Sequence, residues 1–154
     1  DLTRVFQRQT GRARRQPVHL QHAAAVAADQ GSGLRQRTHI DLAEAHDPTS
    51  YADLQQIETL GLAEPGTVGA RAAAGDFALG GLTPVNPSGG LVAKGHPVGA
   101  TGLAQIFELT TQLRGEAGPR RVGHARLPVA ETGGGSLGVE EAATVVTVLE
   151  GRAA

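Results

Sequence analysis

NPSGGLVAKGHPVGATG, residues 86–102, is the segment of this 154-residue chain that says most about its fold and its functional site. It ends a longer segment, residues 80–102, that holds seven glycines and three prolines in twenty-three positions. An irregular stretch of this length is typical of a functional loop held on a rigid scaffold. Within it, His96 lies between Gly95 and Pro97. Gly95 has no side chain, so a ligand can approach the backbone closely there, and the ring of Pro97 fixes its own φ. The sequence therefore predicts a site in this loop.

His96 has the surroundings of a reactive imidazole. A helix predicted to begin a few residues later presents its positive end nearby, which disfavours protonation of the ring. A neutral imidazole can accept a proton from a nucleophile and donate a hydrogen bond to an oxyanion. Spacing alone fits an ordinary loop histidine equally well, so both interpretations of His96 stay open at this point.

The residues after the loop predict an amphipathic helix over 103–114, with Thr101 as its cap. Gly115 and the pair Gly118-Pro119 end it. Its apolar side chains recur with helical spacing, and we expect them to pack on a sheet: Leu103, Ile106, Phe107 and Leu113.

Strands are predicted on both sides of this loop and helix. Residues 39–45 alternate polar and apolar side chains, residues 122–130 form a second strand, and the β-branched residues 143–149 form a third. A helix over residues 51–60, capped by Ser50, carries an apolar stripe of Leu54, Ile57 and Leu60. This order predicts an α/β fold, with a mixed β-sheet flanked by helices.

The first 37 residues differ in charge from the rest of the chain. They carry seven arginines against two aspartates, a balance of +5, whereas residues 38–154 carry seven basic and thirteen acidic groups, a balance of −6. We expect helices over residues 2–15 and 19–29, and a domain boundary that separates residues 1–37 from a folded domain at 38–154. A basic nucleic-acid arm is the alternative to a poorly structured N-terminus. Because aromatic residues make up only 3% of the chain, stacking platforms are scarce, and we expect no nucleic-acid partner.

The sequence contains no cysteine and no methionine. It therefore has no disulfide, cysteine-ligated metal or cysteine nucleophile of its own, and since its histidines lack metal-site spacing we expect no metal. There is no apolar run of about 18 residues and no signal peptide, so we expect no membrane span and a cytoplasmic location. The missing initiator methionine predicts a processed piece, a fragment or a truncated gene product.

Two nucleotide-binding templates fail here. Residues 133–138 fit G-x-G-x-x-G, but the β-branched run that follows predicts a strand where a dinucleotide site needs a helix. Lys94 has alanine before it and glycine after it, which departs from the P-loop. Neither template therefore indicates a nucleotide cofactor.

His46 and Glu131 each follow a predicted strand, where α/β folds place ligands. Each residue by itself also fits a structural role, with Glu131 as a solvated turn residue. Both interpretations of each residue stay open on spacing alone.

Residues 86–102 strongly resemble the signature loop in the C-terminal half of the thiolase superfamily. The resemblance continues through residues 112–118 and 132–135, and the EAHD of residues 44–47 is similar to the strand-end His-Asp motif of one subgroup. That subgroup comprises acetyl-CoA acetyltransferases and lipid-transfer, sterol-carrier-type thiolases. The resemblance covers about residues 38–150 and implies the second of two similar α/β halves.

The resemblance implies acyl transfer on a CoA thioester, without any other cofactor. In the family a cysteine from the first half attacks the thioester. His96 matches the histidine that activates it, His46 a position that supports the same oxyanion site, and Gly133 a backbone donor of the second oxyanion hole. Substrate-binding residues are expected at Ser88, Gly89, Gly95 and Pro97. The implied partner is a thiolase N-terminal half or a partner subunit, in a homo- or hetero-oligomer.

The sequence also departs from the family. Glu131 aligns with the second cysteine, which acts as base for the condensing carbon acid, and a carboxylate can serve as a base there. Pro48, Thr49 and Thr132 replace the residues usual in the subgroup. Because the half with the nucleophile is missing, we expect this chain to be inactive alone. The alternative is a non-catalytic thiolase-like subunit that binds acyl-CoA or a protein partner.

Overall fold

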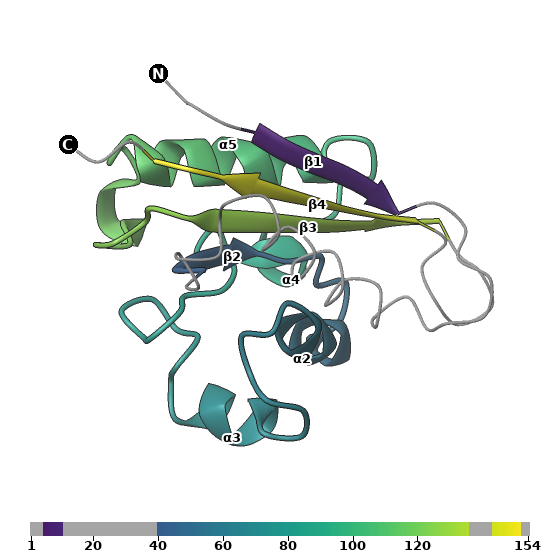
Figure 1. Cartoon of the computed structure of the whole chain (residues 1–154), viewed down its shortest axis with the longest axis vertical. Coiled ribbons are helices and arrows are strands. Elements are labelled where there is room, and N and C mark those ends of the chain that lie inside the picture. Colours follow the sequence, from purple (N-terminus) through teal and green to yellow (C-terminus); the bar gives the residue numbers. More distant parts are fainter. Residues whose placement is uncertain (1–4, 11–39, 136–142, 152–154) are drawn as a thin grey trace.

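The computed structural model describes residues 5–10, 40–135 and 143–151. Its strands form one four-stranded sheet in the order β1-β4-β3-β2 (Figure 1). The strands are β1 (Val5–Thr10), β2 (Leu42–Glu44), β3 (Pro128–Gly134) and β4 (Ala143–Leu149). β2 runs parallel to β3, and the other two pairings are antiparallel. The expected α/β fold with a mixed sheet is therefore confirmed.

Helices flank this sheet (Figure 1). They are α2 (Ser50–Thr59), α3 (Val68–Ala73), α4 (Gly90–Lys94) and α5 (Thr101–Leu113), followed by a 3-10 turn at Gly118–Arg120. α5 packs along β3 and β2, and α2 packs against α3. Within the described residues, no helix is long and apolar enough to cross a membrane.

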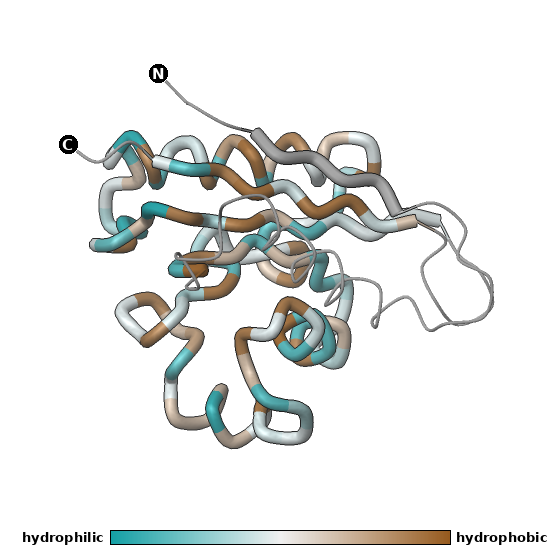
Figure 2. Tube along the Cα trace, viewed as in Figure 1, coloured by the Kyte–Doolittle hydropathy of each residue, from teal (hydrophilic) through white to brown (hydrophobic). Residues whose placement is uncertain are grey.

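Apolar side chains fill both faces of the sheet. The cluster on the α5 face consists of Leu42, Leu109, Ala130 and Leu149. The cluster on the opposite face consists of Ala43, Leu60, Val129 and Val146. The two clusters separate because successive side chains of a strand point to opposite faces. Figure 2 shows brown, hydrophobic segments alternating with paler and teal ones along β3, β4 and α5. Burial of each large side chain contributes roughly 1.5–3 kcal/mol.

The outer edge of β2 is covered by residues 84–86. The Ala43 N–H donates to the Pro84 carbonyl at 3.0 Å, and the Asn86 N–H donates to the Ala43 carbonyl at 2.8 Å. Asn86 has a φ of 52°, in the left-handed region that asparagine tolerates, and its Oδ1 accepts from the Ala45 N–H at 2.8 Å. These bonds hold the start of the glycine-rich loop beside the C-terminal end of β2.

The predicted packing face of α5 is wrong for two of its four residues. Ile106 and Leu113 pack partly buried against the core, whereas Leu103 and Phe107 are 73% and 70% exposed. The predicted cap is also wrong, because Ala100 precedes the helix and makes no side-chain capping bond.

Polar side chains take the place of those two residues on the buried face of α5. That face carries Gln105, Glu108 and Gln112 beside Leu109. Glu108 accepts from Arg120 Nη2 at 3.0 Å and from Gln112 Nε2 at 2.9 Å. Buried polar groups are tolerated when partners satisfy them, so a hydrophobic pattern alone could not identify this face.

The predicted helix over residues 2–15 is wrong where the structure describes it. Val5–Thr10 form β1, which pairs along its whole length with β4. Pairing with a β-branched neighbour strand overrides the helical spacing of the arginines. The predicted helix over 19–29 lies outside the described residues. The boundary after residue 37 stays a prediction, although β1 shares a sheet with the strands beyond it.

Smaller differences concern where elements begin and end. The strand predicted over 39–45 is shorter, and the one over 122–130 begins at Pro128 and continues through Gly134. The glycine-rich loop is interrupted by α4. The helix at 51–60 is confirmed, but its cap is Thr49, whose Oγ1 accepts from the Ala52 N–H at 3.1 Å.

Candidate functional site

Two histidines far apart in the sequence meet at one end of the sheet. His46 follows β2, and His96 lies between α4 and α5. Their ring centroids are 4.9 Å apart and the rings cross at 84°, edge to face. β2 pairs with β3 on one side, and on its other side it bonds to residues 84–86. These bonds hold the glycine-rich loop, which contains His96, near the end of β2. The structure therefore places both imidazoles in one cluster, as the prediction of a shared site requires.

His46 is buried, with 7% of its surface exposed. Among the described residues its Nδ1 has no hydrogen-bond partner, although the atom is buried. Burial lowers the pKa of the His46 imidazole, the neighbouring His96 lowers it further, and Asp47 opposes both. This lowered pKa favours the neutral form of the ring near pH 7.

Asp47 fixes the chain just after His46. Its Oδ1 accepts from the Leu91 N–H at 2.6 Å, which ties the end of β2 to the first turn of α4. Gly90 has a φ of 60°, and a Cβ there would overlap the Asp47 carboxylate. Only glycine therefore allows this close approach of α4 to the His-Asp pair.

His96 is exposed and is oriented through its Nδ1. Nδ1 lies 2.7 Å from Thr101 Oγ1, and that hydroxyl lies 3.4 Å from the Pro97 carbonyl. When the Thr101 hydroxyl donates to the carbonyl, it accepts from Nδ1–H of His96. The Nε2 lone pair is then free to take a proton from a nucleophile.

Glu131 is fully buried rather than a solvated turn residue. The next side chain along β3, Thr132, donates from Oγ1 to Gln105 Oε1 on α5. Because neighbouring side chains alternate along a strand, Glu131 points to the other face of the sheet. Its Oε2 accepts from the N–H of His46, two residues past the end of β2, at 3.1 Å. Glu131 thus supports the backbone of His46.

The predicted backbone donor Gly133 lies two residues farther along β3, paired with Thr144 of β4. Four further positions were predicted to bind substrate, and they surround α4: Ser88, Gly89, Gly95 and Pro97. Gly89 and Gly95 flank α4 with φ of 101° and 91°, which glycine permits. The roles of Gly133 and of these four residues stay predictions.

Sequence reasoning missed three residues that hold the site together: Glu44, Thr101 as a partner of His96, and Gln105. The Gln105 amide donates from Nε2 to the Glu131 carbonyl at 2.8 Å and to the Glu44 carbonyl at 3.3 Å, so it links α5 to β3 and β2. The only sequence feature that could have identified them is a polar residue at a position that faces the core in a strand or helix. Which positions face the core depends on how the strands pair and how α5 packs, and these become visible only in the folded chain.

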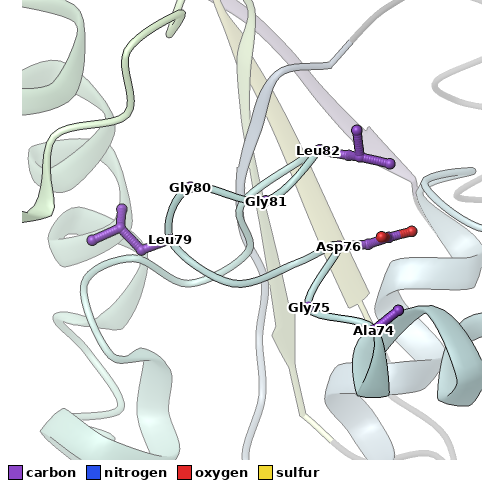
Figure 3. Close-up of a pocket in the computed structure, with 7 residues that line it drawn as sticks. All are labelled: Ala74, Gly75, Asp76, Leu79, Gly80, Gly81 and Leu82. Carbon is purple, nitrogen blue, oxygen red and sulfur yellow. The ribbon is translucent and has the colours of Figure 1, made fainter.

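An open surface pocket of about 420 Å³ lies elsewhere, lined by residues between Ala74 and Leu82 (Figure 3). The side chains of Leu79 and Leu82 point away from each other in Figure 3. None of the predicted site residues lines this pocket. Within the described parts of the chain, no group of three His, Cys, Asp or Glu side chains could hold a metal ion.

Comparison with known proteins supports the resemblance found in the sequence. The family described as thiolase C-terminal domain-like matches residues 8–149. Sterol carrier protein 2 of Oryctolagus cuniculus is 48% identical over 122 residues, 79% of this chain and 21% of that protein. Acetyl-CoA acetyltransferase of Methanothermobacter thermautotrophicus is 48% identical over 99 residues, 64% of this chain and 26% of that protein.

A solved structure shows the same fold. The Ltp2-ChsH2(DUF35) aldolase superposes with a TM-score of 0.71 and 19% identity, over 95% of this chain and 38% of that one. The chain spans only about a fifth to a quarter of the length of the curated relatives named above. The family match begins inside β1, and it covers both histidines and the loop between them. This chain belongs to the thiolase C-terminal domain-like family.

Proposed function

We propose that this chain is one half of a thiolase-like acyl-CoA acyltransferase, the half that carries the loop with Gly95, His96 and Pro97 (the Gly-His-Pro loop). The single observation that carries the proposal is the contact of His46 and His96, 4.9 Å apart, with a buried Nδ1 of His46 left without a partner among the described residues. The substrate is a CoA thioester, and no other cofactor takes part. Relatives named acetyl-CoA acetyltransferase support this substrate class.

In the proposed reaction the thiol nucleophile comes from another polypeptide segment, since this sequence has no cysteine. His96 takes the thiol proton through Nε2, and the thiolate attacks the thioester carbonyl. The C–S bond to CoA then breaks, and His96 returns the proton to the departing CoA thiolate. His46 and the Gly133 N–H donate to the oxyanions, and donors of this kind are each worth about 3–4 kcal/mol.

Exposed apolar side chains on the elements around His96 support the proposal that a partner binds this surface. Val92, Val98, Leu103 and Phe107 are exposed, and they belong to α4, the loop and α5. The one charged residue of α5, Glu108, faces the core. Exposed apolar surface of this kind marks interaction sites. We propose that a thiolase N-terminal half, or a partner subunit with the same fold, covers it and supplies the cysteine. A cytoplasmic location belongs to this proposal, and a fluorescent fusion tests it.

The test is acyl transfer by this chain assembled with an N-terminal half. His96→Ala is expected to lower kcat by about 10²–10⁴-fold, the usual share of a positioned acid–base group. His46→Ala is expected to cost less, because its role is hydrogen bonding to the substrate. His124→Ala, an exposed histidine in the turn before β3, is the matched control and should leave kcat unchanged. Full acyl transfer by the His96 variant would refute the mechanism.

A second candidate is a non-catalytic thiolase-like subunit that binds acyl-CoA or a protein partner. The observation in its favour is that Glu131 stands where a catalytic cysteine is expected and bonds to the His46 backbone. Saturable binding of acetyl-CoA by the assembly, with no acyl transfer in the native protein or in a Glu131→Cys variant, would support this candidate over the first.

A further inference from the structure

The carboxylate of Glu44 sits at the centre of a polar cluster that the proposed mechanism does not use. Glu44 is the last residue of β2, two positions before His46, and its surface is 0% exposed. Its side chain lies on the α5 face of the sheet, by alternation with Leu42. A carboxylate this deeply buried is costly unless hydrogen bonds and an opposite charge compensate it.

Two residues of the glycine-rich loop supply that compensation. Ser88 donates from its N–H to Glu44 Oε1 at 3.0 Å and from its hydroxyl to Oε2 at 2.6 Å. Lys94 Nζ lies 3.4 Å from Glu44 Oε2 and donates to Ser88 Oγ as well. Lys94 is the only lysine in the sequence. Both Glu44 oxygens, the Ser88 hydroxyl and the Lys94 ammonium group are therefore bonded within the cluster.

The two loop residues stand at opposite ends of α4. Ser88 comes two residues before the helix, and Lys94 is its last residue, two positions before His96. The same carboxylate thus holds both ends of α4 against β2, the strand that His46 follows. Between them, Asp47 holds the first turn of α4 through Leu91.

We propose that Glu44, Ser88 and Lys94 form a positioning clamp that sets the distance between His46 and His96. None of the three touches the reacting atoms in this arrangement. The clamp acts on the loop, because only Gly95 separates Lys94 from His96, so that release of Lys94 loosens the backbone at His96. A displacement of about 1 Å in a reacting group can cost 10²-fold in rate, so such a clamp has catalytic weight. This last consequence rests on the proposed acyl transfer, whereas the clamp itself does not.

The test uses the full chain with Lys94→Met and Ser88→Ala, which remove one loop contact each. Two NMR measurements report on His46 and His96: the cross-ring nuclear Overhauser effect and the titration of the His46 imidazole. Burial and the neighbouring His96 lower the pKa of His46, so release of the loop should move its titration midpoint up toward 6.5. We expect loss of the cross-ring effect and that upward shift in both variants. Lys94→Arg, which keeps the charge, should restore both signals, and Arg114→Met controls for the loss of a surface charge.

A variant that leaves Glu44 charged and unpaired can fail to fold. The double variant Glu44→Gln with Lys94→Met removes both charges and keeps the shape of the pair, so it should fold and still lose the cross-ring effect. Native-like spectra in Lys94→Met, Ser88→Ala and the double variant would overturn the clamp.

Acyl transfer by the assembled protein then separates the two proposals. We expect Lys94→Met to lower kcat by about 10–100-fold with KM unchanged, because the substrate still binds while His96 is displaced. Loss of the cross-ring effect with unchanged kcat would leave the clamp standing and refute the role given to His96. A retained cross-ring effect would refute the clamp, whatever happens to kcat.

Discussion

Glu131 Oε2 accepts a hydrogen bond from the His46 backbone N–H at 3.1 Å, across 85 residues of sequence. The bond crosses from β3 to the residue that follows β2, just past the point where the two strands stop pairing. A buried N–H that has left the sheet ladder needs a partner, and the carboxylate supplies it. The residue that replaces the expected cysteine therefore supports the position of His46.

Removal of this carboxylate should destabilise the fold. Glu131→Ala leaves the His46 N–H buried without an acceptor, which costs about 1–3 kcal/mol in free energy of unfolding. Glu131→Gln keeps an oxygen acceptor of the same length and should cost less. Urea denaturation of the two variants measures the difference. Equal losses in both would show that the charge of Glu131 matters rather than its bond to His46.

Asp53 on α2 should make stability depend on pH. Burial first, and then the neighbouring Asp47, raise the pKa of Asp53 from 3.8 to about 6, although Asn86 donates to its Oδ1 at 3.2 Å. The folded state therefore binds a proton more readily than the unfolded state. The stability that protonation adds is fully present below about pH 4 and is lost as the pH rises through 6.

Asp53→Asn should remove this loss. Because asparagine keeps an acceptor for Asn86 without a charge, the variant should gain about 1–2 kcal/mol on the native chain between pH 4 and pH 7, after screening by solvent. Urea denaturation at four pH values across that window measures the difference. A constant difference between variant and native chain would contradict the raised pKa.

Shortening a side chain should lower the free energy of unfolding on the buried side of α5 and leave it almost unchanged on the exposed side. Leu109 is fully buried, and Leu109→Ala should cost about 2–5 kcal/mol in free energy of unfolding. Phe107 is exposed, so Phe107→Ser should change it by about 0.5 kcal/mol or less. The same Phe107 variant should weaken binding of the proposed partner, measured by calorimetry with an N-terminal half. A large loss of stability in Phe107→Ser would show that this face packs within the chain.

Gly90 should not tolerate a side chain. Gly90→Ala places a Cβ against the Asp47 carboxylate and forces alanine into a left-handed conformation. Gly61→Ala is the matched control, because Gly61 has a φ of +73° and a Cβ there would have no other atom within 4 Å. The control should lose about 1–2 kcal/mol through backbone strain alone. Thermal unfolding should show a larger loss for Gly90→Ala, and an equal loss would contradict the close approach of Asp47.

Several local elements and the family could be predicted from the sequence alone. Alternation at β2, the β-branched run of β4 and the apolar stripe of α2 predicted those elements, because strands and helices have their own periods. The Gly-His-Pro loop predicted the thiolase resemblance, and the family match over residues 8–149 agrees with it. The position of His46 at a strand end and of His96 in this loop leaves a structural role open for each, and the family resemblance indicates their place in the site.

How these elements pack against one another depends on long-range contacts that the sequence pattern does not contain. Pairing with β4 made a strand of residues 5–10, and hydrogen-bond partners on the turn after α5 buried Glu108 and Gln112 in place of Leu103 and Phe107. The contact of the two imidazoles and the role of Glu44 follow from bonds between residues far apart in the sequence. Such bonds depend on strand register and on partners that local periodicity does not encode, so no pattern within one element could have predicted them.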